Sequence, residues 1–270
     1  MIRAIGTLIA VYLAICAIMF FFQRNFLYYP DTTPLETIAI GPGWGRVTTQ
    51  TADGLTLAHF HKPAAAGYPT ILLFHGNAGN IGHRLEKFDD LDALGVGVFL
   101  TEYRGYGGNP GKPTEDGLYA DARSAVAWLA DKGVAAADLV IFGASLGSGV
   151  ATAMAAELAD AGTPVAALVL EAPYTSIAET AQYHYPWLPA RWLTLDRYDS
   201  LSRIDRINTE LLVLHGEQDR TIPFALGLEL FEEARAPKTF IGLPNTGHAY
   251  LLREDAAREA LNTLVLKPVS

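Results

Sequence analysis

Six short apolar runs alternate with helical segments from residue 70 onward. Each run is continuously apolar, which is typical of strands that are buried on both faces of a parallel sheet. The runs are 70–76, 96–103, 138–145, 165–173, 210–219 and 238–243. The buried face of one intervening helix is marked by residues at helical spacing, Leu118, Ala122, Ala125 and Leu129. We therefore expect an α/β fold with a mostly parallel, doubly wound sheet.

Four other segments complete this plan. Residues 26–46 contain three prolines and three glycines and predict an irregular connector. Residues 47–63 predict a strand hairpin that turns at Ala52-Asp53-Gly54. Residues 249–266 predict a last helix with an apolar face, formed by Leu252, Ala256, Leu261 and Leu264. Residues 174–209 are rich in aromatic side chains and too long for a simple loop, so we expect a short cap insertion over the carboxyl edge of the sheet.

The amino-terminal segment has a different pattern. Residues 4–22 are uncharged and mostly apolar, with Arg3 before them and Arg24 after them. As a helix this run would be about 28 Å long, close to the hydrocarbon thickness of a bilayer. It lacks the polar stripe of a soluble helix, and no small-residue cleavage site of a signal peptide follows it. We predict a single-pass membrane anchor over residues 1–25 and one folded domain over residues 26–270.

The charged residues indicate how the anchor is oriented in the membrane and which partners the chain can bind. Arg3 and the α-amino group precede the apolar run, which favours a domain on the extracytoplasmic side. The net charge of −9 argues against a nucleic-acid partner, because such a partner requires a basic face. The single cysteine, Cys16, excludes an internal disulfide and a thiolate-built metal site. The oligomeric state is left open.

The chemistry centres on Gly143-Ala144-Ser145-Leu146-Gly147. This pentapeptide ends a predicted strand and opens an alanine- and glycine-rich helix over residues 146–161, as the sharp turn called a nucleophile elbow requires. Glycines suit that turn because a Cβ would clash where backbone segments approach closely. We expect Ser145 to lie above the carboxyl edge of the sheet, at the amino end of a helix that favours developing negative charge.

A serine nucleophile needs a base, and the base needs a carboxylate. Of seven histidines, only His248 follows the last predicted strand, in a loop that would overhang the same edge; His184 lies in the aromatic insertion, where it could line a pocket. Asp219 ends an earlier strand and is the favoured acid, and Glu171, at the end of the preceding strand, is its rival. The order Ser145, Asp219, His248 is the one expected for this type of sheet.

Acyl transfer also requires donors for an oxyanion. The helix-start amide of Leu146 is one candidate. The second is expected in the loop after an early strand, where Gly76 permits close backbone approach and the amide of Asn77 is the best candidate.

Taken together, HGNAGNIGHR, GASLGSG, EYRGYGGNPGKPTEDGL, HGEQDRTIP and NTGHAY resemble the α/β-hydrolase superfamily. More narrowly, they are similar to its membrane-anchored branch of lipases, depalmitoylases and serine-aminopeptidase-like proteins. The resemblance implies the α/β-hydrolase fold, no metal or other cofactor, catalytic roles for Ser145, Asp219 and His248, and an oxyanion role for Asn77 and Leu146. Two features depart from the usual pattern, Glu102 in place of aspartate and Gly108-Asn109 where a serine is common.

The predicted function is hydrolysis of carboxylic esters or thioesters through an acyl-enzyme. The apolar anchor and the aromatic insertion suggest a lipid or acyl-chain substrate at a membrane. A peptidase or amidase on the same triad is the alternative, with Glu171 or Glu179 as a candidate partner for a free amino group. A non-catalytic, membrane-tethered binding protein of the same fold is the third possibility.

Overall fold

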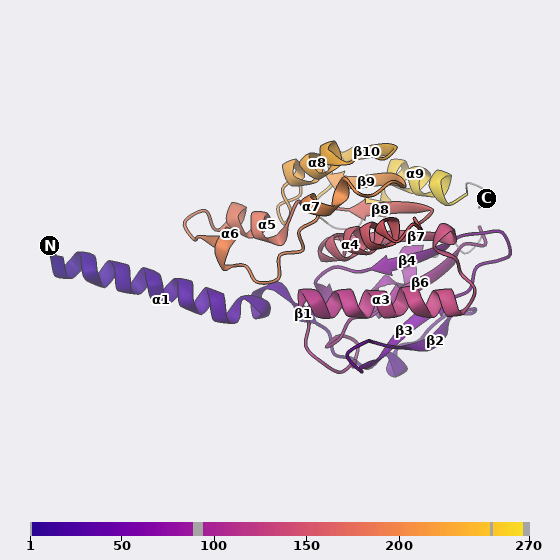
Figure 1. Ribbon diagram of the computed structural model, residues 1–270, viewed down its shortest axis with the longest axis horizontal. Helices are drawn as coiled ribbons and strands as arrows, with labels where there is room; N and C mark the ends of the chain where they lie inside the picture. The colour runs from indigo at the N-terminus through magenta and orange to yellow at the C-terminus, as the bar shows by residue number, and fades with distance from the viewer. Residues whose placement is uncertain (1, 89–93, 249–250, 267–270) are drawn as a thin grey trace.

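The computed structural model describes residues 2–88, 94–248 and 251–266, and most of these residues form one α/β layer (Figure 1). Within them, eight strands pair in the order β10-β9-β8-β7-β4-β6-β3-β2. The pairs from β10 to β6 are all parallel, so the predicted mostly parallel sheet is confirmed. The parallel strands are β4 (Thr70–Phe74), β6 (Gly97–Thr101), β7 (Leu139–Ala144), β8 (Ala167–Glu171), β9 (Glu210–Gly216) and β10 (Lys238–Leu243).

The expected hairpin forms the other end of the sheet. Strands β2 (Gly45–Gln50) and β3 (Thr56–Lys62) pair antiparallel, with Gln50 opposite Thr56 around the predicted turn. Strand β3 then pairs antiparallel with β6, which joins the hairpin to the parallel strands.

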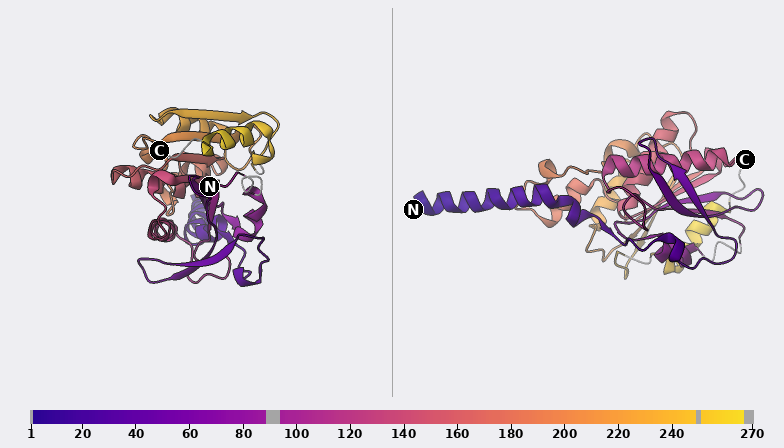
Figure 2. Two further views of the ribbon diagram at one scale, coloured as in Figure 1. Left: turned by 90° about the vertical axis from the view of Figure 1, so that its right-hand side faces the viewer. Right: turned by 90° about the horizontal axis from the view of Figure 1, so that it is seen from below.

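Helices cover both faces of the sheet, as Figure 2 shows, and a separate apolar core lies on each face. On β4, Leu72 and Phe74 point into the core under one set of helices, and Ile71 and Leu73 point into the opposite core. The first set is α3 (Glu115–Asp131), α4 (Leu146–Asp160) and α8 (Phe224–Glu233). The second set is the 3-10 helix η2 (Ile81–Phe88) and α9 (Asp255–Val265). Burial on both faces explains why these strands are continuously apolar.

Helix α3 shows how local sequence sets an element. The side chain of its N-cap residue Thr114 accepts a hydrogen bond from the amide of Gly117, and Glu115 and Asp116 occupy the first turn, where the helix dipole favours acids. In the last helix the inward position is Ala257 and not Ala256, because η4 (Leu251–Arg253) precedes α9 and changes the helical phase. Part of that predicted segment, residues 249–250, lies outside the described residues.

The amino-terminal helix α1 (Ile2–Leu27) extends away from the layer (Figure 1). None of its residues is buried, so it is not a core helix. In the described part of the chain, it is the helix whose length and apolarity would allow it to cross a bilayer. The expected irregular connector after it is partly regular: β1 (Tyr29–Pro30) pairs with β5 (Ala78–Gly79), and η1 (Leu35–Thr37) follows.

The segment 174–209, here named the cap, contains three short helices, α5 (Ile177–His184), α6 (Ala190–Leu193) and α7 (Leu201–Ile204). Helices α5 and α6 lie beside α1 in Figure 1 and in the right-hand view of Figure 2. A further single 3-10 turn, η3 (Ala136–Asp138), precedes β7.

Candidate active site

Ser145 lies at the sharp turn between β7 and α4. Its φ of +51° is in the left-handed region, which a serine adopts only when the surrounding structure imposes it. Packing around two glycines imposes it here. A Cβ added to Gly147 would lie 2.0 Å from the carbonyl oxygen of Phe74, and one added to Gly143 would lie 2.5 Å from the Cβ of Ala151. The turn is therefore as tight as the glycine spacing predicted.

His248 connects Ser145 with Asp219. Its Nε2 lies 2.9 Å from the Ser145 Oγ, and its Nδ1 lies 2.7 Å from the Asp219 Oδ2. The three side chains follow β7, β9 and β10, whose carboxyl ends share one edge of the sheet because all three strands are parallel. The structure thus brings the predicted serine, histidine and aspartate into one hydrogen-bonded chain.

The Asp219 carboxylate is held on both oxygens. Its Oδ1 accepts hydrogen bonds from the amides of Thr221 and Ile222, at 2.8 and 2.9 Å. Its Oδ2 accepts from His248, and the Nε2 of His215 lies 3.4 Å away. Burial alone would raise the pKa of Asp219, but these hydrogen bonds outweigh it and lower the pKa below its usual range. The carboxylate is therefore ionised at neutral pH and oriented toward His248.

Glu171, the rival acid, has a different partner. Its carboxylate forms a short ion pair with Lys87, while its backbone carbonyl accepts a hydrogen bond from the Ser145 amide at 2.8 Å. The side chain is thus directed to Lys87 on η2, and the backbone supports the turn at Ser145.

Other histidines have structural partners. His59 is fully buried, lies 2.8 Å from the Thr49 hydroxyl through its Nε2, and accepts the Glu102 amide through its Nδ1; burial lowers its pKa to about 3. His184 on the cap lies 2.8 Å from the carbonyl oxygen of Thr221, close to the loop that carries Asp219. Within the described residues, His248 is the histidine that reaches Ser145.

The loop after β4 lies against the serine turn. Phe74, the last residue of β4, is in register with Gly143, so the residues that follow β4 continue beside Ala144 and Ser145. A Cβ added to Gly76 would lie 3.3 Å from the Ser145 Cβ, so glycine permits this close approach. The next residue, Asn77, is fixed by its carbonyl oxygen, which accepts from the Tyr29 amide, and by its side-chain amide, which donates to the carbonyl of Leu27.

The sequence did not predict a buried pair of side chains, His75 and Glu102. His75 and Glu102 have fully buried side chains, and the His75 Nε2 donates to the Glu102 Oε1 at 2.9 Å. The His75 Nδ1 lies 2.7 Å from the carbonyl oxygen of Gly76. In a trans peptide this contact turns the Asn77 N–H away from His75. The position of His75 before a glycine and the unusual Glu102 were visible in the sequence, but their pairing was not.

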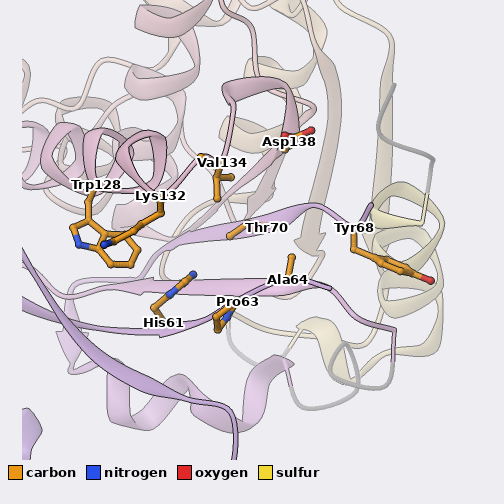
Figure 3. A pocket seen from close by; sticks show the side chains of 10 residues that line it. His61, Pro63, Ala64, Tyr68, Thr70, Trp128, Lys132, Val134 and Asp138 are labelled. Atoms are coloured by element: carbon orange, nitrogen blue, oxygen red, sulfur yellow. The ribbon is translucent and has the colours of Figure 1, made fainter. Parts of the chain in front are cut away.

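A cavity of about 520 Å³ has a lining that contains none of these site residues (Figure 3). Its lining includes Thr70 at the start of β4 and Asp138 just before β7, so it opens at the amino edge of the sheet. Ser145 is at the opposite edge. Among the described residues, no group of three or more histidine, cysteine, aspartate or glutamate side chains is arranged to hold a metal ion.

Comparison with known sequences identifies the family. A family model described as serine aminopeptidase, S33, matches residues 68–201. The chain is 41% identical over 230 residues to an uncharacterized protein of Mycobacterium tuberculosis, covering 84% of this chain and 80% of that protein. It is 37% identical over 237 residues to the lysophosphatidylserine lipase ABHD12 of Danio rerio, covering 81% of this chain and 60% of the lipase. The chain thus spans less than two thirds of that lipase's length.

Solved structures show the same fold. An α/β-hydrolase from Vibrio vulnificus superimposes with a TM-score of 0.71 at 19% identity, covering 88% of this chain and 96% of that one. An esterase from Pyrococcus furiosus gives 0.68 at 15% identity, covering 90% of this chain and 100% of that one. The chain belongs to the α/β-hydrolase superfamily. Within it, the chain is similar to lysophosphatidylserine lipases, and the prediction of a hydrolase of the esterase and lipase type is confirmed.

Proposed function

We propose that this protein is a membrane-bound serine hydrolase that cleaves carboxylic esters or thioesters of acyl-chain lipids through an acyl-enzyme. The observation that carries the proposal is the hydrogen-bonded chain from the Ser145 Oγ through His248 to the ionised Asp219. No cofactor takes part in this chemistry, because the nucleophile, base and carboxylate are all side chains.

The reaction follows from these contacts. The Ser145 Oγ attacks the substrate carbonyl carbon while the His248 Nε2 takes its proton, and Asp219 stabilises the resulting imidazolium. Collapse of the tetrahedral intermediate releases the alcohol or thiol, which receives that proton from His248. Water then attacks the acyl-enzyme with His248 again as base, releasing the acid and restoring the Ser145 hydroxyl.

The oxyanion is assigned to the amides of Leu146 and Asn77. Leu146 is the first residue of α4, and the first amides of a helix have no acceptor within it. The Asn77 N–H belongs to the Gly76–Asn77 peptide, whose carbonyl lies 2.7 Å from the His75 Nδ1, so a contact that is already in place holds this N–H for the reaction. Gly76 allows this loop to approach Ser145 closely, because a Cβ at position 76 would lie 3.3 Å from the Ser145 Cβ.

A peptidase would need an acidic side chain to bind the amino terminus of its substrate. Both candidate acids are already occupied by other partners, and this favours an ester substrate. Glu171 is paired with Lys87, and Glu179 is paired with Arg191 at 2.7 Å. Relatives named lysophosphatidylserine lipases support a lipid ester. Comparing p-nitrophenyl butyrate with alanine p-nitroanilide separates the alternatives, and a peptidase would turn over the anilide faster.

The test compares alanine variants of two neighbouring serines, Ser145 and Ser148. Ser145→Ala is expected to lower kcat for p-nitrophenyl butyrate by about 10⁶-fold. Ser148→Ala is the matched control, because Ser148 is buried one turn along α4 and its hydroxyl has no partner among the described residues. Full activity in Ser145→Ala would refute the assignment. Absence of turnover in the folded wild type across ester substrates would favour a binding protein.

The anchor and its orientation belong to the same proposal. Arg24 pairs with Asp196 through two hydrogen bonds of 2.8 and 3.0 Å, so of the two flanking arginines Arg3 carries the stronger orienting charge. This supports an extracytoplasmic domain. An alkaline phosphatase fused to the carboxyl terminus in a bacterial host is expected to be active, whereas an inactive but stable fusion would contradict the orientation.

A further inference from the structure

A second, apolar cavity of about 150 Å³ lies between α1 and the cap. One wall is formed by α1, with Met19, Phe26 and Leu27, and the other wall by the cap, with Ala181 and Leu193. We name this cavity the anchor groove. It is distinct from the larger cavity at the amino edge of the sheet, with which it shares no lining residue.

Hydrogen bonds between residues about 170 positions apart hold the two walls together. The side-chain amide of Gln23 donates to the carbonyl of Leu193 at 3.1 Å and accepts from the amide of Leu195 at 2.7 Å. The carboxylate of Asp196 is buried and binds Arg24 and the hydroxyl of Tyr28. The end of α1 is thus part of the folded domain, and the groove is a fixed feature of it.

The α1 wall of the groove is hydrogen-bonded to the proposed oxyanion loop. Leu27, which lines the groove, accepts a hydrogen bond on its carbonyl from the Asn77 side chain at 2.8 Å. The preceding residue, Gly76, lies directly against Ser145. The α1 wall of the groove is therefore joined to the serine turn through Asn77 and Gly76.

The outer end points toward the position of a bilayer. The Tyr12 hydroxyl donates to the carbonyl of Trp187 at 3.0 Å, so the cap extends along α1 to the middle of the apolar run. The cap also exposes two large aromatic side chains, Trp187 by 54% and Trp192 by 82%. Both views that show α1 from the side place α5 and α6 next to it (Figures 1 and 2). Exposed tryptophans beside an apolar span are typical of a membrane interface.

We propose that the anchor groove holds the acyl chain of a membrane lipid, which enters from the bilayer and places its ester carbonyl at Ser145. This inference rests on the proposed function. The occupant is a lipid chain, because α1 is long and apolar enough to lie in a bilayer and so surrounds the outer opening with lipid. The size also fits: an apolar cavity of 150 Å³ takes up a six-carbon ring, and a longer chain continues along α1.

Filling the groove tests the proposal. The full chain in phosphatidylcholine vesicles is assayed with p-nitrophenyl palmitate and p-nitrophenyl butyrate, and the ratio of kcat/KM for the long over the short ester is compared between variants. Ala181→Trp fills the groove from the cap, and Met19→Trp fills it from α1, so the test does not depend on one variant folding. Ala130→Trp is the control, because it makes the same change on the exposed surface of α3.

Each groove-filling variant is expected to lower the palmitate-to-butyrate ratio by about 200-fold, the loss for about four methylene groups that are no longer buried. Ala130→Trp is expected to keep the wild-type ratio. A wild-type ratio in folded Ala181→Trp and Met19→Trp, with both esters hydrolysed, overturns the groove and leaves the serine hydrolase intact. Absence of hydrolysis of either ester by the wild type instead overturns the proposed function.

Entry from the bilayer has its own measurement. Brominated phosphatidylcholine vesicles are expected to quench the tryptophan fluorescence of the full chain. Because Trp187 and Trp192 are the tryptophans of the cap, the double variant W187F/W192F is expected to lose most of that quenching. Equal quenching of the wild type and the double variant would show that the cap does not contact lipid.

Discussion

Replacing Asp219 with asparagine tests how the carboxylate prepares His248. The substitution keeps the size of the side chain and its Oδ1, which accepts the amides of Thr221 and Ile222. The new side-chain nitrogen then takes the place of the Oδ2 that faces the His248 Nδ1. Two N–H donors would face each other unless His248 changes tautomer. In the other tautomer its Nε2 carries the proton and cannot accept the proton of Ser145.

The magnitude follows from this loss of the base. An asparagine in place of the triad aspartate leaves geometry and substrate binding intact but lowers kcat by about 10⁴-fold, which corresponds to about 5 kcal/mol in the activation free energy. The free energy of unfolding is expected to fall by only about 1–3 kcal/mol, the contribution of one hydrogen bond to a charged group. The effect on turnover therefore exceeds the effect on folding.

The assay compares kcat and KM for p-nitrophenyl butyrate with thermal unfolding of the same preparation. Glu171→Gln is the matched control, because it makes the same chemical change in the acid that competed for this role and that pairs with Lys87. It is expected to lose stability but to keep its turnover per folded molecule.

A different pattern would refute the reasoning. If Asp219→Asn kept kcat within about tenfold of wild type, a loss of only about 1.4 kcal/mol, the carboxylate would not orient His248 during the reaction. If Glu171→Gln instead lost about 10⁴-fold, the acid of the triad would be Glu171.

Two further predictions concern stability. Burial lowers the pKa of His59 from 6.5 to about 3, so as the pH falls the unfolded chain binds a proton at His59 before the folded chain does. The contribution of His59 to the free energy of unfolding should therefore drop by about 2 kcal/mol between pH 6.5 and pH 5. Urea unfolding at both pH values should show a smaller drop in His59→Gln, and an equal drop would contradict the assignment. Gly147→Ala should lose about 3 kcal/mol or more, because its Cβ would lie 2.0 Å from the carbonyl oxygen of Phe74. Gly41→Ala, whose Cβ meets no atom closer than 4.0 Å, should stay within about 0.5 kcal/mol of wild type, and equal losses in the two variants would refute the packing argument.

Much of the fold was predictable because burial is encoded locally. All six apolar runs form strands, and Leu118, Ala122, Ala125 and Leu129 are fully buried on α3 as their spacing predicts. The pair β1 and β5 was missed because strands of two residues are too short to show a pattern. In the last segment Leu252, Leu261 and Leu264 are buried as predicted, but Ala257 is buried in place of Ala256, since η4 interrupts the helical spacing before α9.

The candidate site was predictable as far as its side chains lie just after the ends of predicted strands. Ser145, Asp219 and His248 were found from a turn motif and from chain order, because parallel strands bring their carboxyl ends to one edge. Their catalytic roles stay predictions, as do the oxyanion roles of Asn77 and Leu146. The contacts of Gln23 and Arg24 with the cap were not predictable, because no local pattern encodes partners about 170 residues apart.

The most direct test of the central claim is to identify the residue that becomes covalently modified. The full chain is treated with an alkyl fluorophosphonate and analysed by intact mass and by peptide mass spectrometry. We predict one adduct, located on Ser145, that is absent from Ser145→Ala and present in Ser148→Ala. An adduct on another residue, or undiminished labelling of Ser145→Ala, would contradict the account.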